Sequence, residues 1–266
     1  MHDVRPAAVA GMFYPGAPER LARDVRGFLA EARRSRSTVP KALIVPHAGY
    51  VYSGSIAAAA YALLAPVRDV VTRVVLLGPA HRVAVRGLAT TSATAFATPL
   101  GEIAIDTDAV AVALTFAQVV ASDTAHAHEH ALEVQLPFLQ TVLRRFTLVP
   151  FAVGRATPQD VAEVVDALWG GPETLVVVSS DLSHYHAYAE AKRIDRATAD
   201  AILAMSPTLD HEQACGATPV NALLQCASRR CLSPALLDLR NSGDTAGDRA
   251  RVVGYASIAF SGHGPG

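Results

Sequence analysis

The chain has 266 residues, of which 51% are hydrophobic and 18% are charged, a composition that suits one large α/β domain with a sizeable core. Its 23 basic and 24 acidic side chains leave a net charge of -1, which gives no support for binding to nucleic acid. The three cysteines (Cys215, Cys226 and Cys231) form neither a CxxC pair nor a secreted disulfide pattern. We therefore expect a single domain over residues 1–266, with thiols kept in a reducing compartment.

The hydropathy pattern gives no support for a membrane protein. The N-terminal residues lack a basic region followed by an apolar run, and the longest apolar stretch, Ile56 to Val67, is too short to span a bilayer. These features predict a cytoplasmic protein.

Helical and strand patterns alternate along the chain. Pro18 opens a segment with Leu21, Val25 and Phe28 on one face, which predicts an amphipathic helix. After it, short runs rich in Val, Ile and Leu predict strands at Ala42–Val45, Arg73–Leu77, Phe146–Pro150, Thr174–Val178, Leu236–Arg240 and Arg251–Phe260. The helical patterns between them cover Gly54–Leu64, Thr107–Phe116, a segment from His130, a segment opened by Thr157, Tyr188–Met205 and Pro219–Ala227.

This alternation predicts a single-domain α/β fold with a mostly parallel or mixed central sheet and helices on both faces. The earlier apolar runs are nearly continuous, as expected for central strands that are covered on both sides.

Polar side chains follow three of the predicted strands. His47 and His81 each lie just after a strand, and Asp181 and His184 follow a third. Residues that follow separate parallel strands converge in the crevice beyond the carboxyl ends of an α/β sheet. We therefore expect these side chains to form one site. Each histidine taken alone is equally well explained as a hydrogen-bonded structural imidazole.

Two imidazoles and one anionic side chain can hold a divalent transition metal and leave positions open for substrate, O₂ or water. The residues leave the third ligand open among Asp181, Glu129 and Cys215. Asp181 could instead orient His184 from behind, and Cys215 precedes a predicted helix whose positive end favours thiolate. An inert buried thiol is the alternative for Cys215, whereas Cys226 and Cys231 are interpreted as structural.

Two further histidine-containing segments have simpler interpretations. In the stretch His126 to His130 we expect His130 to face the crevice and His126 and His128 to lie on the surface. His211 and Glu212 resemble the start of an HExxH zinc motif, but no later ligand supports it.

Several other chemistries lack their motifs. Dinucleotide-binding, P-loop and GxSxG patterns are absent from the sequence. A serine hydrolase using Ser179 or Ser180 would leave His47 and His81 unexplained.

The chain resembles the Memo family over nearly its whole length. The matching stretches are RPAAVAGMFYP, VPHAGYVYSG, LLGPAHR, TPLGEIAID, EHALEVQLPFL, VPFAVG, SSDLSHY, ACGATPVNALL and VVGYASIAF. This family is similar in fold to class III extradiol dioxygenases, which open catechol-type rings with non-haem Fe(II). The resemblance thus implies a class III extradiol dioxygenase-like fold with a core of residues 5–260.

The resemblance also implies roles for individual residues. His47, His81 and Cys215 would be metal ligands, with Cys215 in the place of the dioxygenase carboxylate. His184 would match the acid/base histidine, Asp181 the nearby acidic group, and His130 the second pocket histidine. A thiolate ligand favours Cu or Zn as well as Fe(II), and it can itself be oxidised.

These observations support one main hypothesis, an oxidative metalloenzyme that acts on a phenolic or catechol-like small molecule with Fe(II). The first alternative is a binding module that captures a peptide or a protein in the same crevice. The second is a zinc-dependent hydrolase with the same ligands. Prokaryotic members of the family also imply a radical S-adenosylmethionine enzyme as a protein partner.

Overall fold

The computed structural model describes residues 3–32 and 39–262. Within these residues, nine strands form one mixed sheet in the order β10-β12-β2-β9-β3-β8-β4-β7, with β11 paired to β12. The strands of this sheet are β2 (Ala42–Val45), β3 (Arg73–Pro79), β4 (Leu88–Thr90), β7 (Val119–Ala121), β8 (Thr147–Val153), β9 (Thr174–Ser179), β10 (His184–His186), β11 (Ser233–Asn241) and β12 (Val252–Ser261).

The centre of the sheet is parallel. β9 pairs in parallel with β2 on one side and with β3 on the other, and β3 pairs in parallel with β8. Apart from the first residue of β3 and of β8, every residue of these four strands is buried. A strand that is buried on both faces needs apolar side chains at every position, which explains the continuous runs of Val, Leu and Ile.

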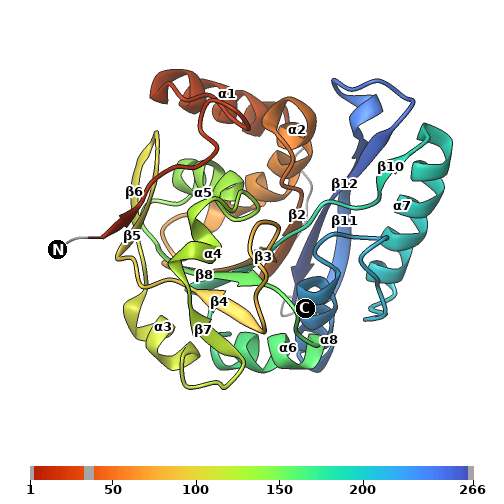
Figure 1. Cartoon of the computed structure of the whole chain (residues 1–266). Helices are drawn as coiled ribbons and strands as arrows, with labels where there is room; N and C mark the ends of the chain where they lie inside the picture. The colour runs from red at the N-terminus through yellow and green to blue at the C-terminus, as the bar shows by residue number, and fades with distance from the viewer. Residues whose placement is uncertain (1–2, 33–38, 263–266) are drawn as a thin grey trace.

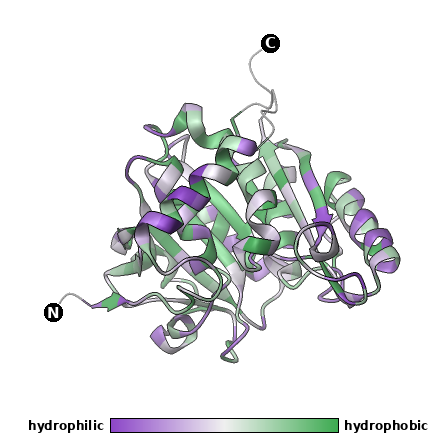
Figure 2. Cartoon of the chain, turned by 90° about the horizontal axis from the view of Figure 1, so that it is seen from above, coloured by the Kyte–Doolittle hydropathy of each residue, from purple (hydrophilic) through white to green (hydrophobic). Residues whose placement is uncertain are grey.

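Helices cover both faces of the sheet (Figure 1). α1 (Pro18–Glu31), α2 (Tyr50–Tyr61) and α5 (Leu136–Val142) pack on one another, and α6 (Pro158–Ala167) packs on α8 (Ala217–Arg229) across the sheet from them. α7 (Tyr188–Leu203) packs on β11 and β12. The other helical segments are α3 (Thr107–Ala113), α4 (Asp123–Ala127) and the 3₁₀ turns η1 (Ala62–Val67), η2 (Glu133–Gln135) and η3 (Ser242–Asp244). Figure 2 shows apolar central strands with hydrophilic residues gathered on the surrounding helices and loops.

A small second sheet brings the N-terminal segment into the fold. Its order is β1 (Val4–Arg5), β5 (Ala95–Thr98) and β6 (Gly101–Ala104). β1 pairs in parallel with β5, so the chain from residue 4 onward is fastened to the body of the protein.

One helical segment among the described residues, Tyr50–Val67, is long and apolar enough to cross a membrane. It comprises α2 and η1 and begins before the apolar stretch noted in the sequence. Because α2 packs against α1, β2 and β12, its apolar side chains belong to the core of the α/β fold.

The predicted α/β class and sheet are confirmed, and each of the six predicted strands is present within a few residues. The helix predicted from His130 begins later than expected. The chain first forms the 3₁₀ turn Glu133–Gln135, and α5 begins at Leu136 with Pro137 in its first turn. Proline lacks a backbone N–H and is therefore favoured at a helix start. The short strands β1, β4, β5, β6, β7 and β10 were not predicted.

Gly254 of β12 holds the loop that follows β9. Its N–H donates to the Ser183 carbonyl at 2.9 Å, and its carbonyl accepts from the Leu182 N–H at 2.8 Å. A Cβ at this position would lie 2.1 Å from a carboxylate oxygen of Asp195. The contact leaves space only for glycine.

Gly254→Ala is therefore expected to destabilise the protein by about 1–3 kcal/mol, because Asp195 or the strand must shift. Urea unfolding of the variant beside the unaltered chain measures the effect. Gly27→Ala is the control for an added methyl group: a Cβ there would meet nothing within 4 Å, and because Gly27 lies inside α1 the variant should be at least as stable as the unaltered chain. Equal stability of Gly254→Ala and the unaltered chain would contradict this account of the loop.

Candidate metal centre

Three neighbouring parallel strands end at one pocket. His47 lies two residues beyond β2, His81 two residues beyond β3, and Asp181 two residues beyond β9. The pocket has a volume of about 470 Å³ and is lined by His47, His81, His130, Asp181, His184, Tyr185, His211, Glu212 and Cys215. The expectation that His47, His81, Asp181 and His184 converge is confirmed by this lining.

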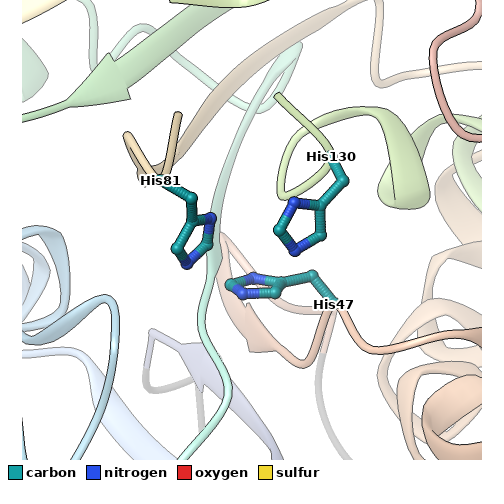
Figure 3. Close-up of side chains that lie close together, drawn as sticks. All are labelled: His47, His81 and His130. Carbon is teal, nitrogen blue, oxygen red and sulfur yellow. The ribbon is translucent and has the colours of Figure 1, made fainter. Parts of the chain in front are cut away.

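Three histidines point toward one another in this pocket (Figure 3). One ring nitrogen from each of His47, His81 and His130 lies within 4.8 Å of the others. The ring centroids are 5.2 Å apart for His47 and His81 and 4.7 Å apart for His81 and His130. Imidazole nitrogens at this spacing could hold one transition metal ion.

A hydrogen-bond network fixes the tautomer of His47. The Ser179 hydroxyl donates to the Ala131 carbonyl at 2.6 Å and accepts from the Gln135 amide at 2.8 Å. Because its one proton is used, Ser179 must accept from Nδ1 of His47, which lies 2.9 Å away. The lone pair of His47 is therefore on Nε2, the atom that approaches Cys215.

Glu129 fixes His81 in the same way. Its carboxylate accepts from Nδ1 of His81 at 2.9 Å and from the His81 backbone N–H at 2.6 Å. Burial acts to raise the pKa of Glu129, but hydrogen bonds from His81 and from the Ala131 N–H lower the pKa to about 2. An ionised carboxylate cannot donate, so Nδ1 of His81 carries a proton and Nε2 is the nitrogen that a metal could bind. Glu129 thus contacts a candidate ligand from behind, and its oxygens are occupied by protein donors.

His130 differs from the other two histidines. Its Nδ1 is buried and has no hydrogen-bond partner among the described residues, although Glu129 Oε1 lies 3.3 Å away. Burial and His47 lower the pKa of His130 to about 4, and burial and His81 lower that of His47 to about 3. Both rings are therefore neutral near pH 7, as metal ligands must be. These donors fit a divalent transition metal.

Cys215 lies beside the cluster. Its Sγ is 3.4 Å from Nε2 of His47, and the Asp181 N–H donates to the sulfur at 3.3 Å. Burial and the Asp181 charge raise the pKa of the Cys215 thiol to about 12. The protein alone therefore keeps the thiol protonated. The third ligand position is thus approached from two sides, by His130 and by Cys215.

Asp181 and His184 occupy the wall of the pocket. Asp181 is buried and accepts from the His47 backbone N–H at 2.7 Å, and burial raises the pKa of its carboxyl group. His184, the first residue of β10, is half-buried. Among the described contacts, Asp181 makes no hydrogen bond to His184, so its observed role is to hold the backbone of His47.

The N-terminal segment supports the loop that carries Glu129 and His130. Arg5 donates to the carbonyl of Glu129 at 2.7 Å and forms a buried ion pair with Glu133. Glu133 also accepts from Tyr14, and the ring of Phe13 lies 4.7 Å from that of His130. Apart from its position in the histidine-bearing segment, nothing in the sequence pattern indicates that Glu133 is buried.

The surface position predicted for His126 is wrong. This side chain is 1% exposed, and its Nε2 lies 2.9 Å from the Ala89 carbonyl, because α4 packs this side of the loop against β4. The prediction for His128 is confirmed, since it is exposed. Cys226 is buried and Cys231 is exposed.

His211, Glu212 and Tyr185 also line the pocket, although no sequence pattern places them there. The two nitrogens of His211 lie 3.3 Å from the Cys215 carbonyl and 3.3 Å from the Thr218 hydroxyl.

Comparison with known proteins gives one consistent family. The model of the Memo-like protein family matches residues 5–259. A MEMO1 family protein of Methanopyrus kandleri is 36% identical over 280 residues, covering 96% of this chain and 98% of the relative. MEMO1 family proteins of Aquifex aeolicus and Methanosarcina mazei are 34% and 36% identical, each covering at least 96% of both chains.

The role of Ser179 can be tested by removing its hydroxyl. Ser179→Ala leaves Nδ1–H of His47 without an acceptor, so we expect metal affinity to fall about 10–100-fold. Competition of Zn²⁺ between the protein and a chromophoric chelator measures this. Ser257→Ala is a matched control, because Ser257 is equally buried but bonds the Ile56 carbonyl away from the site. Unchanged affinity in Ser179→Ala would show that the serine does not orient His47.

Proposed function

Because this chain belongs to the Memo family, we propose that it is a metal-dependent oxidoreductase acting on a phenolic or catechol-like small molecule, with non-haem Fe(II) as its metal. The observation that carries the proposal is the cluster of three imidazoles at a pocket that also holds His184 and Cys215. The resemblance to class III extradiol dioxygenases supports the same chemistry.

The protein's own part in this reaction begins with ligand orientation. His47 and His81 would hold the metal through Nε2, since their Nδ1 atoms are bonded to Ser179 and Glu129. Cys215 or His130 would complete the set. Bound iron would supply the redox chemistry that allows a phenolic ring to react with O₂.

The remaining pocket residues handle the substrate. His184 would take the proton of a substrate hydroxyl on a ring nitrogen and later return it, the general acid–base role that histidine most often has. Asp181 would keep His47 in place through the backbone hydrogen bond described above. His130, if it is not a ligand, would position the substrate beside the other two rings.

A zinc-dependent hydrolase is the second candidate, since three histidines and a water are a common catalytic zinc set. It predicts that the protein retains zinc and consumes no O₂ with any phenol. The non-catalytic binding module and the radical S-adenosylmethionine partner remain predictions. A stable complex with such a partner that is unaffected by His47→Ala would favour the binding module.

The role of His184 gives a direct test of the enzymatic proposal. With Fe(II)-loaded protein and a catechol panel, oxygen uptake is expected to fall about 10²–10⁴-fold in His184→Ala while the iron content stays unchanged. His128→Ala is the matched control, because His128 is exposed and does not line this pocket. Loss of iron in His184→Ala would make His184 a ligand. Undiminished uptake with iron retained would remove it from the proton transfer.

A further inference from the structure

The charged side chains that line the pocket do not match those that usually bind an aromatic acid. Its lining consists of five histidines, two carboxylic acids, Tyr185 and Cys215, with no lysine or arginine among the described residues. Recognition of a substrate carboxylate normally uses a guanidinium or ammonium group that faces the ligand. No such group from residues 3–32 or 39–262 lines this pocket.

Two arginines have contacts close to the pocket in the sequence or the structure, but neither is among its lining residues. Arg251 lies with its guanidinium 5.1 Å from the centroid of the Tyr185 ring and does not line the pocket. Arg82 follows His81 directly, but it lines a separate hollow with Met12 and Val83. Neither arginine supplies the missing positive charge within the pocket lining.

Glu212 contributes an acidic group to the pocket. It is exposed, and its carboxylate has no hydrogen bond or ion pair in the described part of the chain. Its backbone N–H donates to Asp210 at 3.0 Å, which fixes the chain immediately before Cys215. Because the carboxylate is unpaired, its field is available to an incoming ligand, and it attracts cations and repels anions.

The inner end of the pocket combines groups of both signs, because the carboxyl group of Asp181 lies there beside the histidines and Cys215. α2 and α8 begin just after His47 and Cys215, so the positive ends of two helices lie beside these residues. A metal held by the histidines would add further positive charge. Phenolic oxygens are therefore favoured next to the histidines, and a cationic or neutral substituent is favoured beside Glu212.

We infer that this pocket takes phenolic compounds whose second substituent is an amine or is uncharged, and that Glu212 makes it discriminate against aromatic carboxylates. The phenolic part of this inference rests on the proposed function. The charge preference rests on the pocket lining alone, so the two can fail separately.

The charge preference can be measured without a substrate. Cys215 lies in the pocket, and methanethiosulfonate reagents of similar size carry an aminoethyl, a methyl or a sulfonatoethyl group. In the full chain treated with a chelator, peptide mass spectrometry follows the labelling rate of Cys215. We expect the cationic reagent to be favoured over the anionic one about tenfold, relative to the same ratio for free mercaptoethanol.

Glu212→Gln should bring this ratio close to that of the free thiol, and Glu19→Gln, which alters an exposed glutamate of α1, should leave it unchanged. The ratio at the exposed Cys231 should be the same in all variants. If Cys215 reacts too slowly, Tyr185→Cys places a reporter at an exposed lining position. Equal rates for the cationic and anionic reagents at both reporters would overturn the inference.

A second measurement separates the inference from the proposed function. Calorimetry on the full chain loaded with redox-inert Zn²⁺ compares 4-(2-aminoethyl)catechol, 4-methylcatechol and 3,4-dihydroxyphenylacetate. We expect the amine to bind about tenfold more tightly than the acid, and Glu212→Gln to remove most of the difference. Equal binding of all three would contradict the charge preference and leave the proposed function standing. Charge-selective labelling of Cys215 without catechol binding would contradict the proposed function and support the charge preference.

Discussion

The parallel pairing of β9 with both β2 and β3 is the constraint on which the candidate site depends. Parallel strands deliver their carboxyl ends to one edge of the sheet, so three loops far apart in sequence begin within one pocket. The buried, continuously apolar strands fix this arrangement, because helices pack on both of their faces. His47, His81 and Asp181 therefore meet in one pocket, and the hydrogen bond from the His47 backbone N–H to Asp181 adds to this arrangement.

Buried polar groups then set the chemistry of the loops. Ser179 and Glu129 accept from Nδ1 of the two imidazoles and leave Nε2 available to a metal, and Glu133 anchors the N-terminal segment against the same region. A buried carboxylate without partners would be costly, and both glutamates are satisfied by several N–H donors. These hydrogen bonds hold three histidines close together. Protonated imidazoles would repel one another at this spacing, so the arrangement is favourable only if the rings are neutral or a metal binds between them.

The sequence predicted those parts that depend on local patterns. Continuous apolar runs located the central strands, and polar residues after them located His47, His81 and Asp181. The same patterns do not predict the short strands, because the pairing of these strands depends on contacts between residues far apart in the chain. Glu129 shows a further limit of prediction from sequence. A carboxylate beside several histidines is a plausible metal ligand, but in the structure its four hydrogen bonds to backbone and imidazole groups place it behind His81. His126 was misassigned because only the packing of α4 decides which side of that loop is buried.

Whether His47 and His81 hold a metal is measured by the metal content, determined by mass spectrometry, of protein purified without oxygen or a chelating tag. We expect about one equivalent of iron in the unaltered chain and none in the His47→Ala, His81→Ala double variant. Single variants Cys215→Ala and His130→Ala, measured beside them, identify the third ligand by which one loses iron. Absence of metal from the unaltered chain, even after reconstitution with Fe(II), would contradict the account.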